Sequence, residues 1–171
     1  MPYRLRCMDT VSKEIRSRIM SAVRGKNTRV ELEVRRRLFA MGFRYRLHAN
    51  WLPGKPDLVF PKHRAAVFVH GCFWHMHGCH LSQFPATRRA WWQRKLSGNH
   101  HHDREMLNAL RELSWRTLVV WECSFRRPGI NRSGALDGIA RQVSKFLLSR
   151  RKSLEIPAGV RCTPSTKRAG G

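Results

Sequence analysis

The densest group of reactive side chains in the sequence lies between residues 70 and 80, which hold two cysteines and four histidines. A further cysteine, Cys123, follows an apolar segment that is expected to form a strand. Thiolates and imidazoles are the ligands that zinc prefers, and four of them close a tetrahedral site that stabilises a fold rather than performing catalysis. We therefore expect a structural Zn²⁺ site with four ligands: Cys72, His77, Cys79 and Cys123.

The sequence leaves other assignments of this cluster open. The spacing of its cysteines and histidines is not that of a common zinc finger, and His75 and His80 are competing ligands. Alternatively, Cys72 and Cys123 are thiols buried in the core, as free cysteines often are, and His77 is a surface side chain. The clustering of the donors, rather than the presence of cysteine, favours the metal.

Asp57 is the first candidate for a catalytic metal site, because it follows the turn 53–56 and opens an apolar segment. A carboxylate at a strand start is well placed to hold Mg²⁺ beside a phosphate, and magnesium needs only one or two carboxylates besides water and substrate. The alternative is that Asp57 only caps the turn. Glu31 is equally ambiguous, because Thr28 and Glu31 have the spacing of a helix capping box.

Histidines in the same region are candidates for proton transfer. His70 and His75 lie on either side of the aromatic pair 73–74, and a histidine near a metal-bound phosphate activates water or protonates a leaving oxygen. Either histidine is otherwise a hydrogen-bonded loop residue. Residues 100–102 are consecutive histidines that we interpret as a solvated helix start, and Asp103 behind them either orients a catalytic histidine or favours the helix N-terminus.

Aromatic side chains accompany the cysteines and histidines. Phe73 and Trp74 lie on the histidine-rich loop, whereas Trp91 and Trp92 are neighbours on an expected helix. Neighbouring helical residues point about 100° apart, so both tryptophans cannot face one core. In a basic protein, exposed rings stack on bases or wedge between base pairs. The alternative is that Phe73 and Trp74 pack over the zinc loop.

Positive charge is the strongest global feature of the sequence. Lys and Arg number 34 against 11 Asp and Glu, which gives a net charge of +23 and a pI of about 11.6. A globular protein this basic is expected to bind a polyanion, and we favour nucleic acid over a ribosomal or membrane-surface role. Charge alone provides affinity for phosphates and no chemistry.

The length and the cysteine usage limit the class further. A chain of 171 residues fits one domain with its own core. It has no apolar run of membrane-spanning length and no secretion signal, so we expect a cytoplasmic protein without disulfides. Of its five cysteines, Cys7 and Cys162 lie near the termini and are expected to be unpaired.

The periodicity of apolar residues predicts alternating helices and strands. Helices are expected at residues 12–23, 28–41, 85–96, 100–113 and 133–148, and strands at 43–48, 57–60, 65–69 and 116–122. This order predicts an α/β fold in which helices flank a mixed central sheet. We divide the chain into a flexible basic arm (1–11), a single domain (12–148) and a disordered basic tail (149–171).

Three finer expectations concern the helices. Gly98 and Asn99 are expected to separate two helices, and Ser133 is expected to cap the last one. The consecutive arginines at 35–37 are expected to be solvated, and the alternative is that they contact phosphate.

Four stretches of the sequence resemble the very short patch repair DNA mismatch endonucleases. They are LPGKPDLVF, VFVHGCFWHMHGC, PATRRAWWQRKL and ELSWRTLVVWEC, and they occur in this order within residues 12–125. The resemblance implies a restriction-endonuclease-like core, which agrees with the mixed sheet and flanking helices expected from periodicity, together with a structural zinc site. The tail after Ser149 lies outside it.

The resemblance also implies a reaction and partners. The expected activity is Mg²⁺-dependent hydrolysis of one strand, on the 5′ side of the thymine in a T·G mismatch that arises when 5-methylcytosine deaminates. The expected substrate is double-stranded DNA, and the expected associates are mismatch-repair proteins, a repair polymerase and a cytosine-5 DNA methyltransferase. The resemblance further implies a monomer that works at a prokaryotic nucleoid.

Several active-site roles follow from the resemblance, residue by residue. Asp57 matches the carboxylate that binds magnesium, with the backbone carbonyl of Val69 as a second ligand. His75 matches the catalytic histidine that assists proton transfer. The further active-site positions match His70, Glu31 and Asp103.

The zinc and DNA-wedging positions also match. The family's zinc ligands fall on Cys72, His77, Cys79 and Cys123. Its wedging aromatics fall on Phe73, Trp74 and Trp92. Wedging unstacks base pairs at a cost of roughly a few kcal/mol, and a mismatch lowers that cost, so deformability contributes to selectivity.

The sequence departs from the family at a few positions and leaves other functions open. Val69 stands where some members have threonine, and Met76 and Gly78 occupy positions that can be histidine. The alternatives are an inactive module that binds mismatched DNA, a restriction-type endonuclease that cuts matched duplex, and a zinc-stabilised RNA-binding protein.

Overall fold

The computed structural model describes residues 28–47, 49–85, 87–126 and 131–157, together with Ser12, Ile15 and Arg18. The expected basic arm and most of the helix expected at 12–23 lie outside the described residues, as does His48. The amide of Ile15 donates to the Ser12 hydroxyl at 3.3 Å, which is the hydrogen bond expected of a serine cap. No helix in the described part of the chain combines the length and the apolar composition that crossing a membrane requires.

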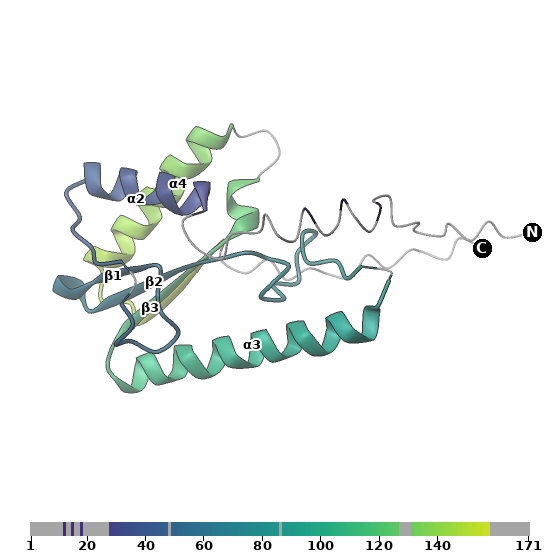
Figure 1. Cartoon of the computed structure of the whole chain (residues 1–171). Coiled ribbons are helices and arrows are strands. Elements are labelled where there is room, and N and C mark those ends of the chain that lie inside the picture. The colour runs from purple at the N-terminus through teal and green to yellow at the C-terminus, as the bar shows by residue number, and fades with distance from the viewer. Residues whose placement is uncertain are drawn as a thin grey trace, which may run out of the picture.

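The described strands form one mixed sheet in the order β1-β2-β3-β4 (Figure 1). Its members are β1 (Leu58–Phe60), β2 (Ala65–His70), β3 (Arg116–Trp121) and β4 (Ser153–Ile156). β1 and β2 form an antiparallel hairpin, whereas β3 pairs in parallel with both β2 and β4. The mixed sheet and the strands expected at 57–60, 65–69 and 116–122 are confirmed.

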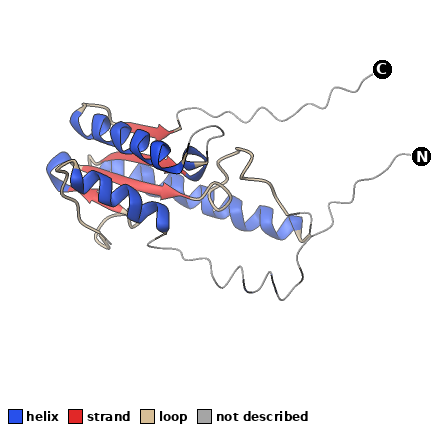
Figure 2. Cartoon of the chain, turned by 90° about the horizontal axis from the view of Figure 1, so that it is seen from above, coloured by secondary structure: helices blue, strands red, loops and turns tan. Residues whose placement is uncertain are grey.

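Helices cover both faces of the sheet (Figures 1 and 2). α2 (Arg29–Ala40) and α4 (Arg132–Leu148) lie on one face, and α3 (Arg89–Glu112) runs along the other. Successive strand residues alternate between two buried clusters, as the pleat requires. Val67 and Leu118 pack with the α2–α4 layer, whereas Phe68 and Val119 pack on the side of α3.

The helices expected at 85–96 and 100–113 are a single 24-residue helix, so the predicted break is wrong. A lone glycine in a helix costs only about 1 kcal/mol, and Gly98 is surrounded by open space. Burial of Leu96 and Leu110 on the inner face offsets that cost. Asn99 is used for a contact instead of a break, because its side-chain amide donates to the carbonyl of Trp74 at 3.2 Å.

The strand expected at 43–48 is also wrong, since residues 43–47, the part of this segment that the structure describes, make one isolated bridge, between Arg46 and Val59. Its alternation of apolar residues has another cause. The rings of Phe43 and Tyr45 pack edge-on against Phe60, with centroid distances of 6.4 and 5.9 Å. Alternation therefore reflects two aromatic residues covering the end of the core rather than a continuous ladder.

The last helix begins one residue earlier than expected, and its cap is Asn131 rather than Ser133. The Asn131 side chain accepts the amide hydrogen of Gly134 at 2.7 Å. Ser133 instead receives a hydrogen bond from Arg37.

The expected disordered tail contains β4, so the boundary at residue 149 is wrong. The guanidinium of Arg116 donates to the carbonyls of Phe146, Leu147 and Ser149, at the end of α4 where the chain turns back. β4 then adds to the sheet edge and buries Ile156. A four-residue strand in a basic context carries too little periodicity to be recognised from sequence.

We predict that Ile156→Ala lowers the free energy of unfolding by about 2–4 kcal/mol, because it leaves a cavity in the core. Ser153→Ala, on the exposed start of the same strand, is the control and should change it by less than about 0.5 kcal/mol. Urea denaturation followed by circular dichroism measures both. Equal stability of the two variants would show that β4 does not belong to the folded core.

Candidate functional site

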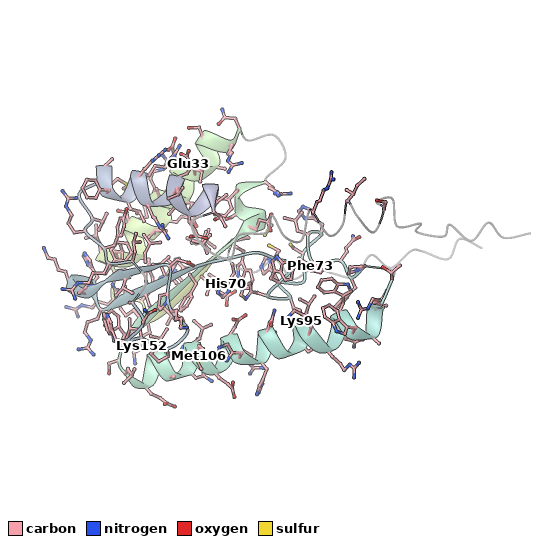
Figure 3. The ribbon with its side chains drawn as sticks, viewed as in Figure 1. Glu33, His70, Phe73, Lys95, Met106 and Lys152 are labelled. Atoms are coloured by element: carbon pink, nitrogen blue, oxygen red, sulfur yellow. The ribbon has the colours of Figure 1, made fainter. Side chains whose placement is uncertain are left out.

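A cavity of about 260 Å³ opens between the sheet and α3. All five acids and histidines selected as catalytic candidates line it: Glu31, Asp57, His70, His75 and Asp103. They come from α2, the residue before β1, the end of β2, the loop after β2 and the middle of α3. Figure 3 shows His70 between the sheet and α3, and Met106 on the part of α3 that closes the cavity.

Asp57 lies one residue before β1 and is held by the backbone of the neighbouring strand. Its Oδ2 accepts the amide hydrogen of Val69 at 2.8 Å. Burial raises the pKa of Asp57 to about 6, helped by the charge of Glu31, whereas the Val69 amide and the charge of Arg35 lower it. The fold thus keeps a carboxylate in a place where its negative charge is poorly solvated, which favours binding of a cation.

Glu31 combines a capping role with a place in the cavity. Its amide donates to the Thr28 hydroxyl at 3.3 Å, and that hydroxyl donates to Glu31 Oε1 at 2.9 Å. Its other oxygen, Oε2, lies 3.1 Å from the buried guanidinium of Arg35. Because this pair is buried, the expectation that Arg35 is solvated is wrong.

The two other arginines of that run differ from each other. Arg37 bonds to Glu33 and Asp137 at 2.7 and 2.6 Å and so joins α2 to α4, whereas Arg36 is exposed as expected.

His70 and His75 are stacked, with ring centroids 3.9 Å apart and planes 6° apart. His75 Nδ1 lies 2.5 Å from Asp103 Oδ2. Burial opposes ionisation of Asp103, but its hydrogen bond to His75 and the histidine charges outweigh burial and lower its pKa. Asp103 is therefore an ionised acceptor, which places the His75 proton on Nδ1 and leaves Nε2 as the basic nitrogen.

His70 is more deeply buried than its partner. Burial lowers the pKa of His70 to about 3, and the charge of His75 lowers it further, so His70 is neutral near pH 7. The pair thus consists of a neutral imidazole and a second imidazole whose proton is fixed by a carboxylate.

The cavity lining also contains Asn50, Lys55 and His102, which sequence reasoning did not select. His102 belongs to the histidine run that was expected to be a solvated helix start, and the run instead lies in the middle of α3. In the sequence, Lys55 belongs to the motif around Asp57. Its position two residues before this candidate metal ligand was the one sequence feature that could have marked it as a site residue.

The donors of Cys72, His77, Cys79 and Cys123 lie within 4.8 Å of one another. His77 Nδ1 is 3.5 Å from the Cys72 sulfur and 3.4 Å from the Cys123 sulfur, so it is the nitrogen that faces the cluster. The competing ligands lie elsewhere, because His75 pairs with Asp103 and His80 is exposed. Three sulfurs and one imidazole at such spacing fit a tetrahedral metal site of the zinc type.

Backbone amides and burial prepare the sulfurs for a cation. The amides of Cys123 and Leu81 donate to the sulfurs of Cys72 and Cys79, at 3.3 and 3.4 Å. Burial raises the pKa of the Cys72 thiol, and it raises that of Cys123 to about 11. For Cys79, burial also raises the pKa of the thiol. Hydrogen bonds with the Leu81 amide, the Ser82 hydroxyl and the neighbouring cysteine sulfurs outweigh burial and lower this pKa overall. Burial thus keeps Cys72 and Cys123 protonated as thiols in the absence of a positive charge, and binding of a metal ion would release their protons.

A second layer of contacts fixes the histidine of this cluster. The ring of His77 stacks on Trp121, with centroids 4.2 Å apart. The indole of Trp121 donates to Glu155 on β4 at 3.0 Å. The segment expected to be a disordered tail therefore supports the ring plane of a metal-site residue.

The loop that carries Cys72, His77 and Cys79 contributes two rings to an aromatic cluster, and α3 contributes the third. Phe73, Trp74 and Trp92 contact one another edge-on, with centroids 5.1 to 6.0 Å apart. Trp91 packs against Trp92 on one side and is 39% exposed, as expected of one tryptophan of the pair. Figure 3 shows Phe73 near Lys95 at the N-terminal end of α3, away from the main body of the sheet.

A strongly basic α/β domain with an acid- and histidine-lined cavity, beside a metal-type cluster and partly exposed aromatic rings, has the features of an enzyme that acts on nucleic acid. Comparison with known proteins identifies the family. The model of the family described as DNA mismatch endonuclease Vsr matches residues 8–81.

Relatives of known description extend over most of the chain. The type II nicking enzyme V.XorIIP of Xanthomonas oryzae pv. oryzae is 44% identical over 135 residues, which cover 79% of this chain and 96% of the relative. The DNA mismatch endonuclease Vsr of Escherichia coli is 41% identical over 118 residues, 69% of this chain and 76% of that protein. The type II nicking enzyme V.NmeAIP of Neisseria meningitidis is 36% identical over 134 residues, which cover 78% of this chain and 94% of the relative. The chain belongs to the Vsr family of DNA endonucleases.

We predict that Cys79→Ala lowers the zinc content of the purified protein below about one half and lowers its melting temperature by at least about 5 °C, because the loop loses a ligand. His80→Ala, in the exposed neighbouring position, should leave both unchanged. Elemental analysis and thermal denaturation provide the measurements. Full zinc content in Cys79→Ala contradicts its assignment as a ligand.

Proposed function

We propose that this protein is a mismatch endonuclease that nicks one DNA strand on the 5′ side of the thymine in a T·G pair. The observation that carries the proposal is the convergence of five acids and histidines from four separate segments on one cavity. Two rings of the aromatic cluster lie on the loop that also carries His75. Membership of the Vsr family supports it. A restriction-endonuclease-like core is part of the same proposal, and the mixed sheet between helical layers is compatible with it.

Asp57 and the Val69 carbonyl are the proposed magnesium-binding groups, because carboxylate and carbonyl oxygens are the ligands that Mg²⁺ prefers. Glu31 is the further carboxylate proposed for the catalytic site. When bound, magnesium would polarise the scissile phosphate and stabilise the leaving oxygen. Arg35 and Thr28 hold the Glu31 side chain in its orientation. Together these contacts fix the acids before substrate arrives, so little reorganisation is needed during the reaction.

His75 is the proposed general base. Its Nδ1–H donates to Asp103, so Nε2 is free to take a proton from the attacking water. Neutral His70, stacked against it, limits the orientation of the His75 ring and contacts the phosphate as an uncharged group. Asp103 acts through His75, by fixing its tautomer and its ring plane.

The aromatic cluster is proposed to enter the duplex beside the mismatch. Phe73, Trp74 and Trp92 already contact one another edge-on in the free protein, so little side-chain freedom is lost when they insert. Unstacking a base step costs roughly a few kcal/mol, and a mispaired step costs less than a sound one. The wedge therefore contributes to selection of the mismatch as well as to affinity.

The names of the relatives refine this proposal. Several are described as type II nicking enzymes, which favours cutting of one strand within a particular sequence context over a double-strand cut. Their description as nicking enzymes also fits a protein that accompanies a cytosine-5 methyltransferase and acts on the mismatches that its product generates. We propose that mismatch-repair proteins and a repair polymerase complete the repair tract.

A strand-specific nicking assay in Mg²⁺ tests the proposal. Duplexes carry a central T·G pair in different flanking contexts, with T·A and C·G pairs as matched controls. We predict a single nick 5′ of the mismatched thymine, lost in Asp57→Ala and in His75→Ala, which should remain folded. Binding without a nick in every context supports an inactive module, and cutting of matched duplex supports a restriction enzyme.

The raised pKa of Asp57 predicts a conflict between stability and activity. Its pKa is 3.8 in an ordinary environment and about 6 in the fold, so above pH 6 the ionised carboxylate opposes folding by on the order of 3 kcal/mol. Without added Mg²⁺, Asp57→Asn should therefore be more stable than the wild type at pH 7. The difference should shrink as the pH falls through 6 and disappear below about 4, where Asp57 is protonated in both states.

Denaturant titrations at several pH values measure this difference. Glu112→Gln, at an exposed position on α3, controls for the general removal of one negative charge. Mg²⁺ should raise the melting temperature of the wild type and not that of Asp57→Asn. A variant less stable than the wild type at pH 7 contradicts the assignment of an unfavourably buried charge.

A further inference from the structure

The charge of the active-site cavity presents a problem for its proposed substrate. Glu31, Asp57 and Asp103 bring three carboxyl groups to the lining, and a DNA phosphate carries a negative charge of its own. Among the described residues that line the cavity, Lys55 is the one lysine or arginine. Its side chain is exposed and makes no hydrogen bond or ion pair with the part of the chain that the structure describes.

The turn that carries Lys55 is firmly placed. A side chain at Gly54 would come within 2.9 Å of the Met106 Cβ, so glycine at that position lets the turn pack directly on α3. Pro56 follows Lys55 and is buried. The position of the Lys55 backbone at the mouth of the cavity is therefore fixed by packing on both sides, rather than by the lysine itself.

The backbone of Lys55 is also strained. Its φ is +49°, a left-handed conformation that L residues rarely adopt, and the following proline restricts it further. Glycine or asparagine would adopt this conformation at lower energy. Strained residues of this kind are found at functional sites, where the position of the side chain outweighs the local cost.

We propose that Lys55 is a phosphate-binding residue of the active site, whose ammonium group contacts a non-bridging oxygen of the scissile phosphate. The proposal rests on the nuclease activity proposed above. The lysine, which lines the cavity, offsets the repulsion between the phosphate and the three carboxyl groups. It therefore assists both entry of the phosphate and stabilisation of the charge that develops on it.

Three substitutions separate this role from a role in the turn. Lys55→Gln removes the charge and keeps the length, Lys55→Arg keeps the charge, and Lys55→Gly removes the side chain while relieving the backbone strain. Lys62→Gln is the matched control, because Lys62 is an exposed lysine in the β1–β2 connection and does not line the cavity.

The first measurement is single-turnover nicking of a T·G duplex in Mg²⁺. We expect a loss on the order of 10²-fold in Lys55→Gln and in Lys55→Gly, a loss within about tenfold in Lys55→Arg, and no change in Lys62→Gln. Lys55→Gly should in addition have a melting temperature equal to or above that of the wild type. Loss of activity in a variant at least as stable as the wild type excludes a purely structural role.

The second measurement does not depend on cleavage. Binding of the same duplex without Mg²⁺ is followed as a function of salt, where loss of one phosphate contact lowers the slope of log K against log salt by about 0.9. We expect this decrease in Lys55→Gln and not in Lys55→Arg. Unchanged nicking and an unchanged slope in Lys55→Gln overturn the inference. If the wild type nicks no duplex, the proposed activity fails, and the slope alone decides whether Lys55 contacts phosphate.

Discussion

The cluster of Cys72, His77, Cys79 and Cys123 is the interaction on which the rest of the site depends. The connection from β2 to α3 has little regular secondary structure, yet it carries His75, Phe73 and Trp74. Four donors within 4.8 Å tie this connection to the end of β3. A metal ion bound by these donors would stabilise the connection in place of a hydrophobic core, because a loop rich in glycine and histidine has little apolar surface to bury.

In the neighbouring cavity, by contrast, repulsion between buried acidic groups opposes folding. Three carboxyl groups share one lining, and burial raises the pKa of Asp57 to about 6. The fold reduces this repulsion locally, through the Val69 amide, the Arg35 guanidinium and the His75 imidazole. The repulsion that remains favours binding of a cation in the cavity. Many active sites likewise contain groups that lower the stability of the fold and serve function.

Sequence reasoning succeeded where local pattern and residue type carried the information. Strands β1 to β3 follow from apolar periodicity, and the metal cluster follows from the density of cysteine and histidine. It failed where burial in the folded protein decided the outcome. Gly98 lies within a continuous helix because Leu96 and Leu110 are buried, and Arg35 is buried because Glu31 lies one turn away. β4 is too short to be recognised without the β3 edge on which it forms.

The continuous helix α3 has a geometric consequence. Trp92, in the aromatic cluster, and Asp103, beside the general-base candidate, are eleven positions apart on the same helix. At 1.5 Å per residue this separation is about 16 Å, and it is held by a rigid rod rather than by a hinge. The separation between the aromatic cluster and the cavity is therefore set by one continuous helix. Under the proposed function, this helix would keep a constant offset between the point of entry into the duplex and the point of cleavage.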